Sequence, residues 1–254
     1  MKIHHLRNAT LLLETARHGI LVDPMLGPKG HLPTLTFFRH KARKNPIVEL
    51  PTIWEELSKK VTHCIITHLH PDHIDAAGKA FLRQAQIPVY CSYKDAAVLK
   101  KAGLNVVQTV EYNKRKPFLE GNIEGIPAKH GYGFIAKLMG NVMGFYIELQ
   151  EEPSIYISAD TIYTPAVQRV LSQYQPQLSI VAGGSAQLDI FQPLLMTVED
   201  ILKFVQQAPG NVLINHLEAV NHCPTTRRGL QELFAQYELS NKVFIPEDGE
   251  VVTL

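Results

Sequence analysis

The chain has 254 residues, of which 45% are hydrophobic, so it can build a sizeable core as one domain or two fused halves. Its 25 basic and 24 acidic residues leave a net charge of +1, which gives no overall attraction to nucleic acid or to an anionic membrane. Three cysteines without a CxxC pair argue against a disulfide framework and favour a reducing compartment.

The first residues do not read as a targeting or membrane segment. The opening MKIHHLR is interrupted by charged and polar residues before an apolar stretch develops, unlike a signal peptide. No apolar run approaches the ~20 residues that a membrane helix needs. We therefore expect a cytoplasmic protein without a membrane partner.

The first half of the chain is predicted to alternate strands and helices. Short apolar runs indicate strands at residues 3–6, 9–14 and 19–23. A stretch rich in proline and glycine, residues 27–52, predicts a long loop, and long loops in compact domains often act as lids. Beyond it we expect strands at 61–67, 88–92 and 106–110, with helices at 75–84 and 93–101. This alternation is typical of α/β layers.

The second half is richer in predicted strands. They fall at 122–128, 142–150, 154–158, 178–182, 212–215 and 242–246. Helices are expected at 164–174, from Thr197 as N-cap to the residues before Pro209, and at 226–236. No linker separates independent units, so residues 1–254 are predicted to form a single domain of two similar halves that meet near residue 120.

A cluster of metal-ligating side chains follows the strand predicted at 61–67. His68 and His70 point to the same side of an extended chain, because side chains alternate along a strand. Asp72 and His73 follow the turn at Pro71 and can face a second ion. Imidazole and carboxylate groups suit Zn²⁺, Mn²⁺ or Fe. Chance placement in a polar loop is the alternative, which this density of ligands at a strand end disfavours.

The segment from His68 to His73 resembles the signature of the metallo-β-lactamase superfamily. Within it, the chain is most similar to the branch that contains L-ascorbate-6-phosphate lactonase. Four other segments follow in the family's order, at residues 20–24, 128–131, 158–161 and 214–216. The resemblance implies an α/β fold in which two sheets and flanking helices form a four-layer αββα sandwich.

The resemblance also implies two divalent metal ions, Zn or Mn, with Fe as a further option. One ion would be held by His68, His70 and His130, and the other by Asp72, His73 and His216, with Asp160 bridging them. Asp23 would lie behind a ligating histidine and orient it. Taken singly, Asp23 can equally be a turn residue before Pro24, and the later ligands can be structural.

Three further positions are candidates for contact with substrate. His222 follows the last ligand and can bind the substrate or protonate a leaving group, although it can also be loop structure. Arg39 and Arg43 lie in the basic and aromatic stretch 37–44 and can hold an anionic group, with a solvated loop as the alternative. Asn8 departs from the family, because many relatives carry histidine there.

The expected chemistry is metal-assisted hydrolysis. Two cations that share a water lower its pKa from ~15.7 toward ~7, so a bridging hydroxide can attack a carbonyl carbon or a phosphorus. Asp72 is expected to align this water. The leading hypothesis is hydrolysis of a small anionic ester or lactone, with a sugar-phosphate lactone suggested by the resemblance alone.

Other functions stay open at this stage. A phosphodiesterase of nuclease or phospholipid type is the runner-up, and the neutral net charge argues against nucleic acid. A diiron redox protein is disfavoured, because the related branch usually has glutamate where His70 stands. A metal-binding protein without turnover is a third alternative, which the intact ligand set disfavours. A small-molecule substrate is expected, and a homo-oligomer is compatible with the sequence.

Overall fold

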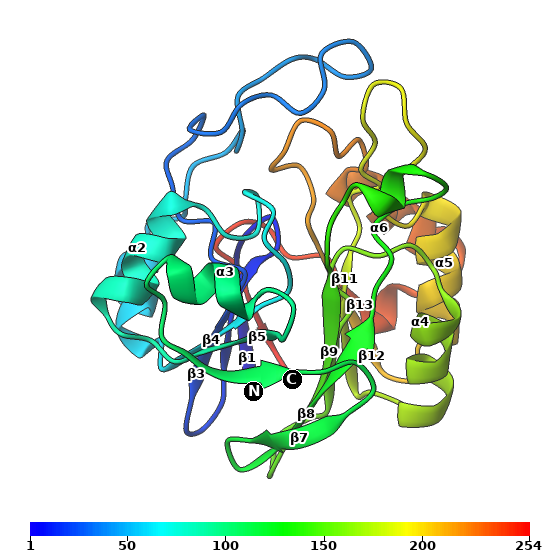
Figure 1. Cartoon of the computed structure of the whole chain (residues 1–254). Helices are drawn as coiled ribbons and strands as arrows, with labels where there is room; N and C mark the ends of the chain where they lie inside the picture. Colours follow the sequence, from blue (N-terminus) through cyan, green and yellow to red (C-terminus); the bar gives the residue numbers. More distant parts are fainter.

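Two β-sheets face each other, and helices cover the outer face of each sheet, in a computed structural model that describes residues 1–254 (Figure 1). The seven strands of the first sheet lie in the order β14-β1-β2-β3-β4-β5-β6, and those of the second in the order β13-β12-β11-β10-β9-β8-β7. The αββα layers confirm the predicted fold class. No helix is both long and apolar enough to cross a bilayer.

The first sheet is built mainly from the first 110 residues. Its strands are β1 (Lys2–Arg7), β2 (Thr10–Glu14), β3 (Gly19–Val22), β4 (His63–Ile66), β5 (Val89–Ser92), β6 (Val106–Val110) and β14 (Val251–Thr253). Helices α1 (Trp54–Leu57), α2 (Ala76–Gln84) and α3 (Ala96–Lys101) accompany it. Leu12, Cys64 and Leu82 belong to the buried cluster formed by this sheet and its helices.

The second sheet is built from strands between residues 115 and 244. Its strands are β7 (Arg115–Phe118), β8 (Gly121–Pro127), β9 (Met143–Leu149), β10 (Ile155–Ile157), β11 (Leu178–Ala182), β12 (Asn211–Asn215) and β13 (Val243–Phe244). Helices α4 (Pro165–Arg169), α5 (Val198–Gln207) and α6 (Arg227–Gln236) pack on it through residues such as Val167, Phe204 and Leu230. Thr197 caps α5 as predicted, since its side chain accepts a hydrogen bond from the Asp200 amide.

The core between the two sheets joins the halves. Leu13 and Ile65 from the first sheet and Phe145 and Ile180 from the second belong to one buried apolar cluster. Their burial follows from the alternation of side chains, which places every second residue of a strand on the inner face. The sheets are therefore held together as one unit by the hydrophobic effect.

Several elements differ from the sequence prediction. Strands β7 and β14 and helix α1 were not predicted. Strands β7 and β14 lie at the edges of their sheets, and their mixed polar and apolar residues carry little periodic signal. The strand predicted at 242–246 is reduced to the half-buried β13, and residues 170–174 continue α4 with π-helical bonding.

The strands that precede the candidate site residues end at the same edge of the molecule. β3 runs parallel to β4, and β10 and β11 run parallel to β12. β8 and β10 are both antiparallel to β9, so they point the same way. Ligands in sheets with parallel strands usually bind beyond the carboxyl ends of those strands. This edge therefore positions the side chains of the candidate site.

Residues 27–52 cross this edge without forming a helix or strand, as predicted (Figure 1, blue). Their start is fixed by the buried Arg7, whose guanidinium donates hydrogen bonds to the carbonyls of Met25, at 3.0 Å, and Gly27. Asn221 holds the middle of the segment, because its side chain accepts from the Leu35 amide and donates to the Thr36 carbonyl.

Candidate metal centre

The seven predicted ligands gather where the strands end. His68, His70, Asp72 and His73 follow β4, whereas His130, Asp160 and His216 follow β8, β10 and β12. All except His70 are buried, and His70 is half-buried. His216 adopts a left-handed backbone with φ of 58°, which turns the chain sharply at the end of β12.

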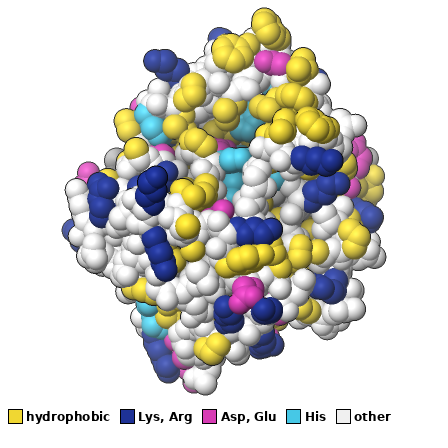
Figure 2. Space-filling view, viewed as in Figure 1, with side chains coloured by type: hydrophobic (Ala, Val, Ile, Leu, Met, Phe, Trp, Pro, Cys, Tyr) yellow, Lys and Arg dark blue, Asp and Glu magenta, His cyan; other side chains and the backbone are white.

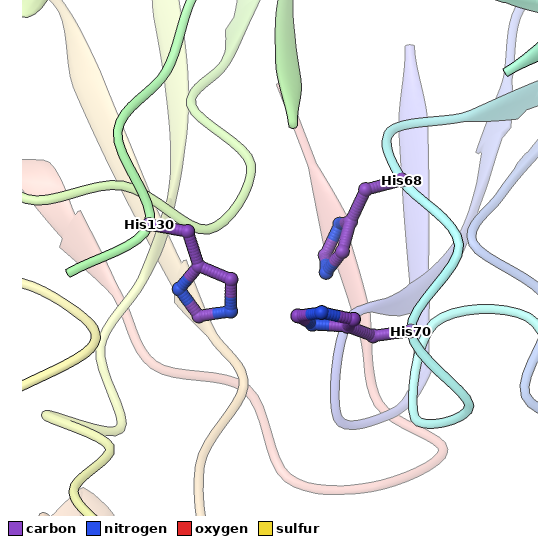
Figure 3. A group of neighbouring side chains, drawn as sticks. All are labelled: His68, His70 and His130. Carbon is purple, nitrogen blue, oxygen red and sulfur yellow. The ribbon is translucent and has the colours of Figure 1, made fainter. Parts of the chain in front are cut away.

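His68, His70 and His130 form the first group of ligand atoms. One ring nitrogen from each lies within 4.8 Å of the others. His68 and His70 come from the loop after β4 in the first sheet, and His130 approaches from the second (Figure 3). Their rings point toward one common space, which lies between the two halves of the fold.

Asp72, His73 and His216 form the second group, again with ligand atoms within 4.8 Å. The Asp72 Oδ2 atom lies 3.3 Å from His216 Nε2. Rings of His68 and His73 have centroids only 4.0 Å apart, so the two groups are immediate neighbours. Two ions could therefore sit side by side, as the two-metal chemistry of hydrolases requires.

Asp160 lies between the two groups. Its Oδ1 atom is 3.3 Å from His73 Nε2, and its Oδ2 atom is 3.5 Å from His130 Nε2 and 3.7 Å from His216 Nε2. The two oxygens of this one carboxylate thus face histidines of both groups. This is the position that a residue shared by two ions must occupy.

Asp23 orients one histidine of each group. Its Oδ2 atom accepts a hydrogen bond from His73 Nδ1 at 2.8 Å and from the Thr67 hydroxyl at 2.6 Å. Because the Thr67 proton is given to Asp23, the Thr67 oxygen can accept from His68 Nδ1, at 3.0 Å. A carboxylate behind a ligating imidazole fixes its tautomer and raises its basicity.

Two of the other histidines, His130 and His216, are held by different partners. His130 Nδ1 donates to the carbonyl of Leu194 at 3.0 Å, and His216 Nδ1 lies 3.5 Å from the sulfur of Cys223. With the Nδ1 protons of His68, His73 and His130 engaged in this way, their Nε2 atoms present bare electron pairs to the interior. Such pairs cannot donate to one another or to a carboxylate.

The donor set fits a pair of cations. His68 Nε2, His73 Nε2 and Asp160 Oδ1 are buried without a hydrogen-bond partner, which is costly unless a cation satisfies them. Ligand bonds of ~2.1 Å in a tetrahedron put ligand atoms about 3.4 Å apart, close to the 3.3–3.7 Å separations around Asp160. Burial alone would lower the pKa of His73, yet Asp160 and Asp23 raise it to about 10, so these carboxylates favour positive charge at this place, which a bound cation can supply instead of a proton.

A cavity of about 190 Å³ opens beside these ligands. One wall carries polar groups, including His70, Asp72 and Asp160. The apolar part of the lining is formed by Leu32, Pro33, Leu35, Pro71, Met139, Leu188 and Leu194. No lysine or arginine lines the cavity. Figure 2 shows histidine side chains at the bottom of a hollow on this face of the molecule.

His222 lines the same cavity and is buried. Burial lowers its pKa to about 4, so the ring is neutral near pH 7, and its Nδ1 atom has no hydrogen-bond partner. A neutral ring can donate a hydrogen bond to a bound molecule or accept one from it, but it has no positive charge with which to attract an anion.

Arg39 and Arg43 do not line the cavity. The Arg39 guanidinium instead donates to the carbonyls of Leu188, at 2.9 Å, and Asp189, at 3.1 Å. Its planar donors are thus used to tie the segment 27–52 to the loop that follows β11. Their predicted role as an anion clamp has no support from this placement.

The residues that hold the ligands in place carry no clear signal in the sequence. Thr67 looked like one more β-branched strand residue, and Leu194 and Cys223 had no recognisable motif. Asn8, noted only as a departure from the family, donates from its side-chain amide to the Asp72 carbonyl at 2.9 Å. The same side-chain nitrogen lies 3.4 Å from His216 Nε2, so Asn8 contacts two residues of the second group.

A facing pair of mixed sheets with histidines and aspartates at their shared edge defines a metal-dependent enzyme of the metallo-β-lactamase fold. The model of the Beta-lactamase superfamily domain matches residues 18–216. UPF0173 protein YddR of Bacillus subtilis (strain 168) is 32% identical over 256 residues, covering 100% of both chains. The chain belongs to the beta-lactamase superfamily, and it is a metal-dependent hydrolase.

Two solved structures are similar over the whole chain. One is an isothiocyanate hydrolase from Delia radicum gut bacteria, with a TM-score of 0.90 and 29% identity, covering 100% of this chain and 99% of the other. The second is a possible metal-dependent hydrolase from Veillonella parvula DSM 2008, with a TM-score of 0.91, 27% identity and the same coverage.

Removal of metal is expected to destabilise the protein. A ligand present at 1,000 times its Kd stabilises the folded state by about 4 kcal/mol, and for a chain of this length that shifts Tm by about 10 °C. We therefore expect Tm to fall by about that amount when a strong chelator is added, and to recover with Zn²⁺ or Mn²⁺. An unchanged Tm, with less than one ion per chain by elemental analysis, would contradict the metal centre.

Proposed function

We propose that the protein hydrolyses a small, uncharged substrate with an apolar substituent, using two divalent ions held by the two ligand groups and Asp160. The observation that carries this proposal is the lining of the cavity beside the ligands. Seven apolar residues, two of them prolines, line the space where a substrate must sit, and no lysine or arginine does. An anionic substituent buried there would lose its hydration without gaining a partner.

This substrate class replaces the sugar-phosphate lactone suggested by the sequence. That suggestion came from the family resemblance, and the cations expected to hold its phosphate, Arg39 and Arg43, have side chains outside the cavity. A cavity of about 190 Å³ is also too small for a folded polynucleotide, and it suits a compact molecule. We therefore infer that carbonyl-like carbon centres are attacked in preference to phosphodiesters.

The residues of the chain have separate roles in this proposal. When bound, a pair of divalent ions supplies a water acidic enough to ionise near neutral pH and positive charge for the developing anion. Asp72 and Asp160 hold that charge in place, and Asp23 keeps two imidazoles aligned. His222 offers its neutral ring to hydrogen-bond the substrate, while Leu188 and Met139 exclude water from its apolar part.

Isothiocyanates are the first compounds to test. They are small, uncharged and carry an apolar substituent, and the relative from Delia radicum gut bacteria is an isothiocyanate hydrolase. Their hydrolysis adds one water to the N=C=S group and releases an amine and carbonyl sulfide. The electrophilic carbon would lie against the ligand wall and the substituent against the apolar walls.

The test is a hydrolysis panel with the protein loaded separately with Zn²⁺ and Mn²⁺. We expect benzyl isothiocyanate or a neutral aryl ester to have a kcat/KM at least about 10-fold above a matched anionic ester, because the charged group would be left unpaired in the cavity. Leu188→Arg should narrow or reverse this preference, whereas Leu188→Met, which conserves volume and polarity, should retain it.

Two results would overturn the proposal. One is faster turnover of a phosphorylated lactone or a phosphodiester than of any uncharged substrate. The other is efficient cleavage of RNA or DNA by the wild-type protein. In either case the apolar walls do not select the substrate.

A further inference from the structure

The mouth of the cavity carries an unusual number of exposed apolar side chains. Phe38 is 92% exposed, Ile190 83%, Phe134 66%, Phe37 61% and Leu138 58%. With about 200 Å² for each large apolar side chain, they expose on the order of 700 Å². The largest apolar patch of a typical monomer is roughly 300–600 Å², and larger ones mark interaction sites.

The segments that carry these side chains are hydrogen-bonded to one another. The amides of Phe37, Phe38 and Arg39 all donate to the Asp189 carboxylate, which holds the aromatic pair beside Ile190. The amide of Tyr132 donates to the Pro193 carbonyl at 3.1 Å, which joins the segment carrying Phe134 and Leu138. We call residues 27–52, 129–139 and 183–196 the mouth surface. The same segments supply the apolar walls of the cavity.

The mouth surface is strongly basic although the chain is almost neutral. It contains seven lysine and arginine residues and two acidic residues, Glu49 and Asp189, in a chain of net charge +1. The Asp189 carboxylate is already engaged by backbone amides. Figure 2 shows lysine and arginine side chains on several sides of the histidine-lined hollow and apolar side chains above it.

We propose that the mouth surface docks on a membrane that contains anionic lipids. Phe37, Phe38 and Ile190 would enter the boundary between headgroups and acyl chains, and the flanking cations, such as Lys41 and Lys44, would contact lipid phosphates. A near-neutral net charge predicted no such attraction, because it averages over faces of opposite sign.

The charges favour lipid over a second copy of the chain. A two-fold pairing through this surface would bring the lysines and arginines of both copies together, and like charges repel. Anionic headgroups complement them instead. The cavity would then open toward the bilayer, in which apolar molecules concentrate. Docking itself does not depend on the substrate proposed above.

The experiment measures sedimentation of the metal-loaded protein with vesicles. We expect binding to vesicles of phosphatidylglycerol and phosphatidylcholine, weaker binding to phosphatidylcholine alone, and loss of binding at high salt. Phe38→Ser with Ile190→Ser, and separately Lys41→Glu with Lys44→Glu, should each weaken binding about 10-fold or more. Lys2→Glu with Arg17→Glu is the matched charge control, because both residues lie at the opposite end of the first sheet.

Circular dichroism and hydrolysis of a soluble substrate should be unchanged in all these variants, because none of the substituted residues lines the cavity. Equal or absent binding to both kinds of vesicle would overturn the proposal. So would a wild-type dimer in light scattering that Phe38→Ser with Ile190→Ser converts to a monomer, since the surface would then be covered by a second copy.

Discussion

Replacing Asp160 with asparagine is expected to lower kcat/KM on the order of 10³-fold. The substitution keeps the shape of the side chain but removes the negative charge shared by the two ligand groups. It places an amide against His73, His130 and His216, at atoms that now lie 3.3–3.7 Å from the carboxylate. We expect the metal content to fall together with the turnover.

The measurement pairs elemental analysis with steady-state kinetics on the best substrate of the hydrolysis panel. Asp95→Asn is the matched control, because Asp95 is also a buried carboxylate but bonds Asn141 away from the ligands. The control should retain both metal and activity. Normal turnover by Asp160→Asn with both ions bound would remove Asp160 from the reaction centre.

Asp23→Asn is expected to weaken the binding of both ions, although Asp23 itself is not a ligand. Its carboxylate bonds the Nδ1 atom of His73 and the Thr67 hydroxyl, and not the Nε2 atoms that face the metal site. Removing an acceptor behind a ligating histidine typically costs 10–100-fold in metal affinity. Here the asparagine oxygen cannot replace both carboxylate oxygens, which together accept from the Thr67 amide, the Thr67 hydroxyl and His73 Nδ1. His68 of the first group and His73 of the second therefore lose their fixed orientation.

Thr67→Val separates the two effects. It removes the hydroxyl that accepts from His68 but leaves the bond between His73 and Asp23 intact. Chelator competition should thus show two weakened ions in Asp23→Asn and mainly one in Thr67→Val. If Asp23→Asn binds both ions as tightly as the wild type, the hydrogen-bonded chain through Thr67 has no part in holding them.

Sequence pattern alone predicts an α/β or α+β domain, and the segment from His68 to His73 adds the αββα sandwich and the metal chemistry through its resemblance to a known superfamily. His68 to His73 stand directly after a β-branched run, and Asp160 and His216 end short apolar runs, so strand periodicity was enough to place them at strand ends. That these distant residues meet in one site was implied by the resemblance to the metallo-β-lactamase superfamily, and not by the strand pattern. The edge strands β7 and β14 were not predicted, because their pairing depends on the neighbouring strands and not on a local sequence pattern.

How the ligands are held and what surrounds them depends on contacts between residues that are far apart in the sequence. The partner of His73 is 50 residues away and that of His130 is 64 residues away, and a backbone carbonyl such as that of Leu194 leaves no trace in the sequence. The cavity is lined by residues from several separate segments, so its apolar character could not be inferred from any one of them. Arg39 is the clearest example. Its positive charge can be read from the sequence, but the direction of its side chain is fixed by the carbonyls of Leu188 and Asp189, about 150 residues further along the chain.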